Sequence, residues 1–300
     1  MGKEDFIHRL IRGWKRFKRP LMYKYFYTAT LKHYYKKNFG FEPDLEHPRT
    51  FNEKTQWLKI HYRNPLMAVC ADKVAVREYI KKKIGPAYLV PVYGIYKKPE
   101  EIDFGSLPGE FVLKPSHSSG KVLLCTDKKS FDQKNARQVM TDWLKENYYD
   151  WSGEWVYKGI PPRLICEKML ARELIDYKFY CFQGEPKCIL ICSDRYHKVK
   201  YAHYNINFEK LPFAIDDHDN NIDLAKPENY EEMMSLARIL AQDFLFVRVD
   251  FYNLAGKIYF GELTFFSNNG MQPFNPPEWD EKLGSWLHLE EISNEHFKKD

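Results

Sequence analysis

The sequence lacks the features that would place it in a membrane or in an oxidising compartment. Its 300 residues contain no apolar run of about 18 residues, and the N-terminus has neither the apolar core nor the small-residue cleavage site of a secretory signal. The six cysteines lie mostly among apolar residues, and no two pairs have zinc-ribbon spacing. We expect a cytoplasmic protein with reduced thiols and without a metal–thiolate site.

Two common catalytic signatures are also missing. The sequence has no phosphate-binding loop that ends in Gly-Lys-Ser or Gly-Lys-Thr, and no convincing Ser/His/Asp or Cys/His arrangement that would supply a nucleophile. Internal repeats and low-complexity tracts are absent as well. With about 150 residues per domain as a prior, the length fits two domains or one domain with two lobes.

Basic charge is concentrated at the N-terminus. Residues 1–40 carry eleven Lys or Arg against Glu4 and Asp5, which is +9, so the other residues carry 5 − 9 = −4. Apolar residues at spacings of three and four between residues 6 and 17 predict an amphipathic helix. We expect residues 1–40 to make peripheral contact with an anionic membrane, where each basic residue contributes on the order of 1 kcal/mol.

Two other interpretations of this basic segment stay open. Nucleic acid is the competing partner, but it is disfavoured because nothing further along the chain resembles a base-reading module. The segment also fits a solvated basic helix that packs on its own protein.

Residues 247–264 predict a β-hairpin, because apolar residues alternate with polar or small ones on both sides of Gly256. A three-residue loop, 254–256, gives a register that turns Val247, Val249 and Phe251 to the core and places on the other face Arg248, Asp250, Glu262 and Thr264. Carboxylates hold hard divalent cations and a guanidinium holds phosphate, so this face outlines a Mg-nucleotide site. A half-exposed hairpin with a cross-strand ion pair fits the same stretch.

Residues 110–126 predict two strands joined by a loop of small residues. Lys114 ends the first strand and Lys121 starts the second, and the loop between them is rich in Ser with one Gly. Such a loop can wrap its backbone around an anion while flanking lysines balance the charge. A surface hairpin with two solvated lysines is the alternative.

Helices and further strands fill the rest of the chain. Thr50 and Glu53 form a capping box ahead of a helix. Other helices are predicted at residues 23–35, 71–85, 131–148 and 227–244, and strands at 88–95 and 163–170. A hairpin at 175–195 places on one face Asp176, Lys178 and Tyr180. Residues 196–226 are polar and predicted to be irregular.

Six segments, in this order, resemble the TupA-like branch of the ATP-grasp enzymes. They are FNEKTQWLKIHYRNP, ADKVAVREYI, DYKFYCFQGEPK, FVRVDFYN, KIYFGELTF and FNPPEWDEKLG. The resemblance covers residues 45–290 and implies an α+β fold of the ATP-grasp type, in which two α+β subdomains clasp a nucleotide. It implies a basic helical N-terminal extension (1–45), an N-terminal part with the first subdomain (46–165), and a second subdomain with the Mg site (166–300).

The resemblance also implies roles for individual residues, with ATP and Mg²⁺ as cofactors. Lys73 and Lys114 match the lysines that contact the nucleotide phosphates. The phosphate-covering loop is matched by Ser116, His117, Ser118, Ser119 and Gly120, and the adenine hinge by Glu167, Lys168, Met169 and Leu170. Asp176 matches the acid that binds the ribose, and Lys178 is also matched to the nucleotide site. The residues matched to catalysis are Lys114, Lys178 and the phosphate-contacting Arg248. Asp250 and Glu262 match the magnesium ligands. Thr264 departs from the family, because many ATP-grasp enzymes have Asn there, so binding of a second metal is in doubt.

The chemistry implied by the resemblance is ATP-dependent ligation through an acylphosphate. We expect an enzyme that attaches an amino acid or amine to an acidic sugar of a surface polysaccharide of the capsule, O-antigen or teichuronopeptide type, or of its precursor, at the inner face of the cytoplasmic membrane. Arg195 and Lys198 are further candidates for binding an acidic substrate. The alternatives are an ATP-grasp phosphotransferase in polysaccharide biosynthesis and a basic, non-enzymatic binding protein.

Overall fold

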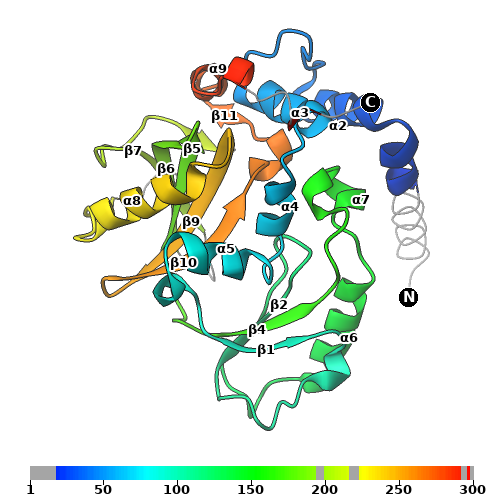
Figure 1. Ribbon diagram of the computed structural model, residues 1–300, viewed down its shortest axis with the longest axis vertical. Coiled ribbons are helices and arrows are strands. Elements are labelled where there is room, and N and C mark those ends of the chain that lie inside the picture. The colour runs from blue at the N-terminus through cyan, green and yellow to red at the C-terminus, as the bar shows by residue number, and fades with distance from the viewer. Residues whose placement is uncertain (1–17, 194–198, 216–222, 292–295, 298–300) are drawn as a thin grey trace, which may run out of the picture.

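Two antiparallel sheets lie on either side of a cavity in the computed structural model, which describes residues 18–193, 199–215, 223–291 and 296–297. Figure 1 shows the larger sheet above the smaller one, with helices around both. The architecture is α+β, as predicted. The helix predicted from residues 6–17 and the candidates Arg195 and Lys198 lie outside the described residues.

The larger sheet has the strand order β10-β9-β5-β6-β7 and the smaller one β1-β4-β2-β3. The strands of the larger sheet are β5 (Asp176–Phe182), β6 (Glu185–Ser193), β7 (Lys200–Asn205), β9 (Phe246–Leu254) and β10 (Lys257–Thr264). Those of the smaller sheet are β1 (Val92–Tyr96), β2 (Phe111–Pro115), β3 (Leu123–Cys125) and β4 (Leu164–Lys168). A short pair joins β8 (Ala214–Ile215) to β11 (Phe274–Asn275).

Helices surround the two sheets (Figure 1). The α-helices are α2 (Tyr27–Phe39), α3 (Phe51–His61), α4 (Pro65–Ala71), α5 (Val76–Lys83), α6 (Gln133–Leu144), α7 (Tyr149–Ser152), α8 (Tyr230–Ala241) and α9 (Glu278–Ser285). Of these, α8 packs against β5, β6 and β9 of the larger sheet and α6 against β2 of the smaller one. Short 3-10 turns are η1 (Pro86–Tyr88), η2 (Pro99–Glu101), η3 (Trp155–Tyr157), η4 (Ser267–Gly270) and η5 (Leu289–Glu291). Within the described residues, no helix has both the length and the apolar character needed to cross a membrane.

Each sheet has its own hydrophobic core. The large core joins the larger sheet to α8, and Val247, Val249 and Phe251 are all 0% exposed in it, as the alternation predicts. The smaller core packs Met140 and its neighbours on α6 against Phe111 and Leu113 of β2. A structure with two cores can place two rigid walls around one cavity.

The β9–β10 hairpin has a different turn from the predicted one. Its loop is two residues, Ala255 and Gly256, both with positive φ (48° and 78°), so the three-residue loop is wrong. A one-residue shift at Gly261 then re-aligns the strands and pairs Glu262 with Asp250. The extra residue of the bulge compensates for a loop that is one residue shorter than predicted. Arg248, Asp250, Glu262 and Thr264 therefore share one face of the hairpin, as predicted.

Two other predictions require correction. The helix predicted from residue 71 begins only at Val76, because the Asp72 carboxylate accepts a hydrogen bond from the Val74 amide (2.9 Å) and holds residues 72–75 in a turn. The segment predicted to be irregular contains β7, whose Ala202 and Tyr204 face the core. The predicted capping box is confirmed, since Thr50 and Glu53 exchange two hydrogen bonds at the start of α3.

Candidate active site

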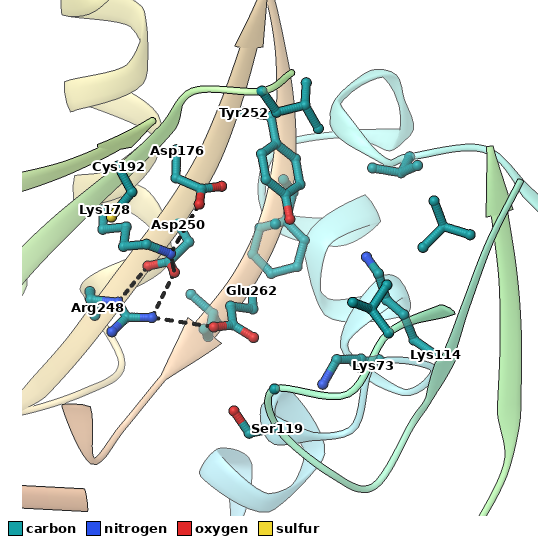
Figure 2. A pocket seen from close by; sticks show the side chains of 18 of the residues that line it. Lys73, Lys114, Ser119, Asp176, Lys178, Cys192, Arg248, Asp250, Tyr252 and Glu262 are labelled. Carbon is teal, nitrogen blue, oxygen red and sulfur yellow. Dashed lines mark hydrogen bonds and ion pairs between the residues drawn. The ribbon is translucent and has the colours of Figure 1, made fainter. Parts of the chain in front are cut away.

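The cavity between the two sheets has a volume of about 660 Å³ and is enclosed by side chains from both. This size suits a nucleotide-sized ligand. Figure 2 shows Lys178, Arg248, Asp250 and Glu262 projecting from the larger sheet toward Lys73 and Lys114 on the opposite side. The two sides are called here the acidic wall, on β5, β9 and β10, and the lysine wall, on β2, β4 and the turn before α5.

The acidic wall is built around Asp250, whose side chain is 3% exposed. Arg248 donates to both of its carboxylate oxygens, with Nε to Oδ1 and NH2 to Oδ2 at 2.7 Å each. Lys178 Nζ donates to Oδ2 at 2.6 Å. Burial alone lowers the pKa of Lys178, but the Asp250 carboxylate outweighs it and the pKa is raised. The three side chains are therefore mutually oriented before any ligand binds.

Glu262 completes the acidic wall. Its Oε1 accepts hydrogen bonds from Arg248 NH2 and Thr264 Oγ1, at 3.2 Å each. Burial opposes ionisation, yet Lys73, Arg248 and Lys178 together lower the pKa of Glu262 to about 2. The carboxylate thus stays ionised at neutral pH, and its described hydrogen bonds leave Oε2 available to a cation.

The lysine wall is less tightly paired. Lys114 Nζ lies 2.8 Å from Glu167 Oε2, and Arg77 lies 3.9 Å from the other carboxylate oxygen. Burial lowers the pKa of Lys114, but Glu167 outweighs it and the net shift is upward. Lys73 Nζ donates to the Ser118 carbonyl at 2.6 Å, and burial lowers its pKa. Both ammonium groups face the acidic wall in Figure 2.

The predicted phosphate-covering loop divides into two parts. Ser119 and Gly120 line the cavity. Ser116, His117 and Ser118 are buried behind it, and the His117 ring is turned to α6, where its Nε2 lies 3.1 Å from the Trp143 carbonyl oxygen. His117 is thus predicted as part of the phosphate-covering loop, but in this structure its ring packs against α6 and does not line the cavity.

The hinge segment spans the end of β4, which stops at Lys168. Glu167, Lys168, Met169 and Leu170 all line the cavity, as do the apolar residues Val112, Leu124 and Phe260. The Lys168 amide donates to the Pro91 carbonyl (2.8 Å), whereas Met169 and Leu170 follow the last paired residue of the strand. Their backbone groups are therefore outside the sheet ladder. Asp176 lies deep on β5 at 1% exposure, 3.6 Å from Lys178.

The donor set fits Mg²⁺. Asp250 accepts three hydrogen bonds, which leaves one of the roughly four lone-pair positions of a carboxylate, and Glu262 offers Oε2. Mg²⁺ in nucleotide sites is held by one or two carboxylates and completed by phosphate and water oxygens. Thr264 donates its hydroxyl to Glu262 and does not line the cavity. In the described part of the chain, no group of three or more His, Cys, Asp or Glu could form an all-protein metal cage.

Sequence reasoning missed the end of the cavity beyond Arg248. Ser267 and Asn268 of η4 line it together with Gln272. Asn268 and Asn269 have positive φ (44° and 61°), and Lys59 of α3 donates to the Asn269 carbonyl at 2.7 Å. The Ser-Asn-Asn-Gly run marks a turn, but nothing local in it indicates that α3 holds it against a cavity.

Comparison of the sequence with known protein families identifies a match. Residues 53–288 match the model of a family described as TupA-like ATPgrasp. Among curated proteins, none matches the chain significantly.

Several solved ligases resemble the structure at low identity. The D-alanine–D-alanine ligase of Bacillus anthracis, complexed with ATP, is 16% identical with a TM-score of 0.42, over 71% of this chain and 59% of that one. The corresponding ligase of Helicobacter pylori is 13% identical (TM-score 0.45; 80% and 67%). An L-amino acid ligase of Bacillus licheniformis is 13% identical (TM-score 0.41; 73% and 43%). This chain thus spans about 59% of the length of the first of these enzymes.

Proposed function

The chain belongs to the TupA-like ATP-grasp family, as its sequence predicted, and from this membership we propose that it is an ATP-dependent ligase that joins a carboxylate to an amine. The observation that carries the proposal is the cavity with two opposed charged walls. Asp250 and Glu262 offer cation ligands on one wall, and Lys73 and Lys114 offer phosphate ligands on the other.

The residues of the cavity have separate roles in this reaction. Lys73, Lys114 and Arg248 neutralise phosphate oxygens and align the γ-phosphate with the attacking carboxylate oxygen. Asp250 and Glu262 would hold Mg²⁺, which supplies further charge neutralisation on the transferred group. The carboxylate oxygen forms a bond to the γ-phosphorus as the bond to ADP breaks, and the amine then displaces phosphate from the acylphosphate. No side-chain nucleophile is required.

Lys178 acts by orienting Asp250. Its ammonium group is held 2.6 Å from Asp250 and 3.6 Å from Asp176, at the junction of the proposed metal and ribose positions. The backbone of Met169 and Leu170, outside the ladder of β4, offers donors and acceptors to an adenine edge between apolar side chains.

For the substrates, we propose an acidic sugar of a surface polysaccharide or its precursor as the carboxylate and an amino acid or other amine as the acceptor. The resemblance to a family associated with surface polysaccharides supports this choice. The cavity supports it as well, because Ser267, Asn268 and Gln272 present hydroxyl and amide groups that suit sugar hydroxyls.

The proposal is tested by ADP release in Mg-ATP with a panel of uronic acids, each with and without a panel of amino acids, followed by mass spectrometry of the product. A ligase releases ADP and phosphate only with both substrates and forms an amide. A phosphotransferase would instead form a stable phosphorylated sugar without an amine. A Lys73→Met variant that releases ADP at the wild-type rate would contradict the site assignment.

A further inference from the structure

Residues 18–40 form a basic, aromatic segment on the outside of the molecule. The segment has no acidic residue, and its cations are Lys18, Arg19, Lys24, Lys32, Lys36 and Lys37. Lys36 forms an ion pair with Glu42 at 3.0 Å. For Lys24, Lys32 and Lys37, no acidic partner lies within ion-pair distance among the described residues. Three of the six cations, Lys24, Lys32 and Lys37, therefore form no ion pair with the described part of the protein.

Three large apolar side chains stand on the same segment in contact with water. Residues 18–25 are helical, and the helix breaks at Phe26 (φ −136°, ψ 48°) before α2 begins at Tyr27. At this corner Leu21 is 43% exposed, Tyr25 64% and Phe26 66%. Leu21 and Tyr25 are four residues apart and share a helix face. We call Leu21, Tyr25 and Phe26 the apolar corner.

The opposite side of the segment is fixed to the protein body. Tyr23 is 1% exposed, and the Tyr27 ring stacks on Tyr149 with an interplanar angle of 9°. The Tyr27 hydroxyl donates to the Gly153 carbonyl at 2.5 Å. The apolar corner is therefore held outward by a packed base. In Figure 1 this part of the chain lies at the outer edge, and none of its residues lines the cavity.

Aromatic and aliphatic side chains next to unneutralised lysines form the surface that a lipid–water interface accepts. Lys24 Nζ lies 5.1 Å from the centroid of the Tyr25 ring, so charge and apolar surface face one side together. Aromatic rings partition into the headgroup region while basic groups meet anionic lipids. Single-stranded nucleic acid also combines aromatics with cations, but it needs a groove of stacking platforms, and Leu21 cannot stack on a base.

We propose that the apolar corner and its lysines dock the protein peripherally on an anionic lipid surface. This inference is independent of the ligase activity. Docking would place the cavity near a lipid-linked or membrane-proximal substrate without any spanning segment.

The test is co-sedimentation of the full-length protein with vesicles. Vesicles of phosphatidylcholine alone are compared with vesicles that contain about one third phosphatidylglycerol, at about 0.1 M and about 1 M salt. The wild type is expected to sediment with the anionic vesicles at low salt and to lose most of this binding at high salt. Tyr25→Ser/Phe26→Ser should weaken the binding by about tenfold or more, because two rings no longer leave water.

A matched control replaces two exposed apolar residues elsewhere. Tyr93 and Ile95 of β1 are 40% and 46% exposed, and Tyr93→Ser/Ile95→Ser should bind vesicles like the wild type. A nucleotide-induced thermal shift checks that each variant is folded. The proposal is overturned if the wild type does not sediment, if both double variants bind equally, or if duplex or single-stranded DNA binds while vesicles do not.

Discussion

The two walls of the cavity hold charge in different ways. On the acidic wall, Arg248 and Lys178 make three hydrogen bonds to one carboxylate that is almost completely buried. On the lysine wall, Lys73 has a backbone carbonyl as its described hydrogen-bond partner, and Lys114 shares Glu167 with Arg77. Removal of one charged side chain from the acidic wall leaves oppositely charged side chains buried without a partner. The ammonium groups of the lysine wall, in contrast, can still bind an anionic ligand. Substitutions in the acidic wall should therefore lower the free energy of unfolding most, and substitutions in the lysine wall should mainly weaken nucleotide binding.

The largest effect is expected at Asp250. Asp250→Ala leaves the Arg248 and Lys178 cations buried without their partner, and breaking a buried pair in this way costs about 3–5 kcal/mol. The free energy of unfolding from urea denaturation measures it. Glu185→Ala is the control, because Glu185 pairs with Arg238 while both side chains are about half exposed (52% and 43%). That variant should change stability by at most about 1 kcal/mol. Equal losses for the two variants would remove the distinction between the walls.

The lysine wall should show the opposite pattern. Lys73→Met removes one charge-assisted hydrogen bond to phosphate, which should weaken Mg-ADP binding by about 1.5–3 kcal/mol in isothermal titration calorimetry. Stability should change by less than about 1 kcal/mol, since Lys73 forms no ion pair within 4 Å among the described residues and Arg248 and Lys178 still neutralise Glu262.

Lys128→Met is the matched control for Lys73. Lys128 Nζ also donates to backbone carbonyls, those of Gly105 (3.0 Å) and Leu107 (2.5 Å), but it does not line the cavity. Its loss should leave Mg-ADP affinity unchanged. If both lysine variants lost affinity equally, Lys73 would not be a phosphate ligand.

The smallest effect is expected at the bulge that aligns the acidic wall. A Cβ added at Gly261 would lie 3.0 Å from the Asp250 carbonyl oxygen, so Gly261→Ala must push β9 and β10 slightly apart. We expect a loss of about 1 kcal/mol of stability together with weaker metal dependence of ADP binding. Gly109→Ala, where an added Cβ meets nothing within 4 Å, should be neutral in both measurements. A neutral Gly261→Ala would show that the bulge tolerates a side chain.

The acidic wall was predictable because alternation along each strand assigns the face without knowledge of the partner strand. Arg248, Asp250 and Glu262 were therefore placed together even though the loop was one residue too long in the prediction. The compensating bulge at Gly261 depends on how closely two backbones approach, which no local pattern encodes.

Tertiary packing explains what was missed elsewhere. His117 is of a type that suits a phosphate loop, and only the position of α6 turns it away from the cavity. Asn268 and Gln272 line the cavity because α3, more than 200 residues earlier in the chain, holds their segment through Asn52 and Lys59. β7 was missed because the residues around it are polar and its own residues do not alternate, since Ala202, His203 and Tyr204 are buried in succession.

The central claim is that Asp250 and Glu262 form the metal side of a nucleotide site, and thermal unfolding in ADP with and without Mg²⁺ tests it most directly. At about 100 times its Kd, Mg-ADP should stabilise the wild type by about 2.7 kcal/mol, a shift of a few degrees. Replacing Mg²⁺ with EDTA should remove most of the shift, and Glu262→Gln should show a small shift that is the same in both conditions. A wild-type shift that is absent at millimolar Mg-ADP, or that does not depend on Mg²⁺, would contradict the account.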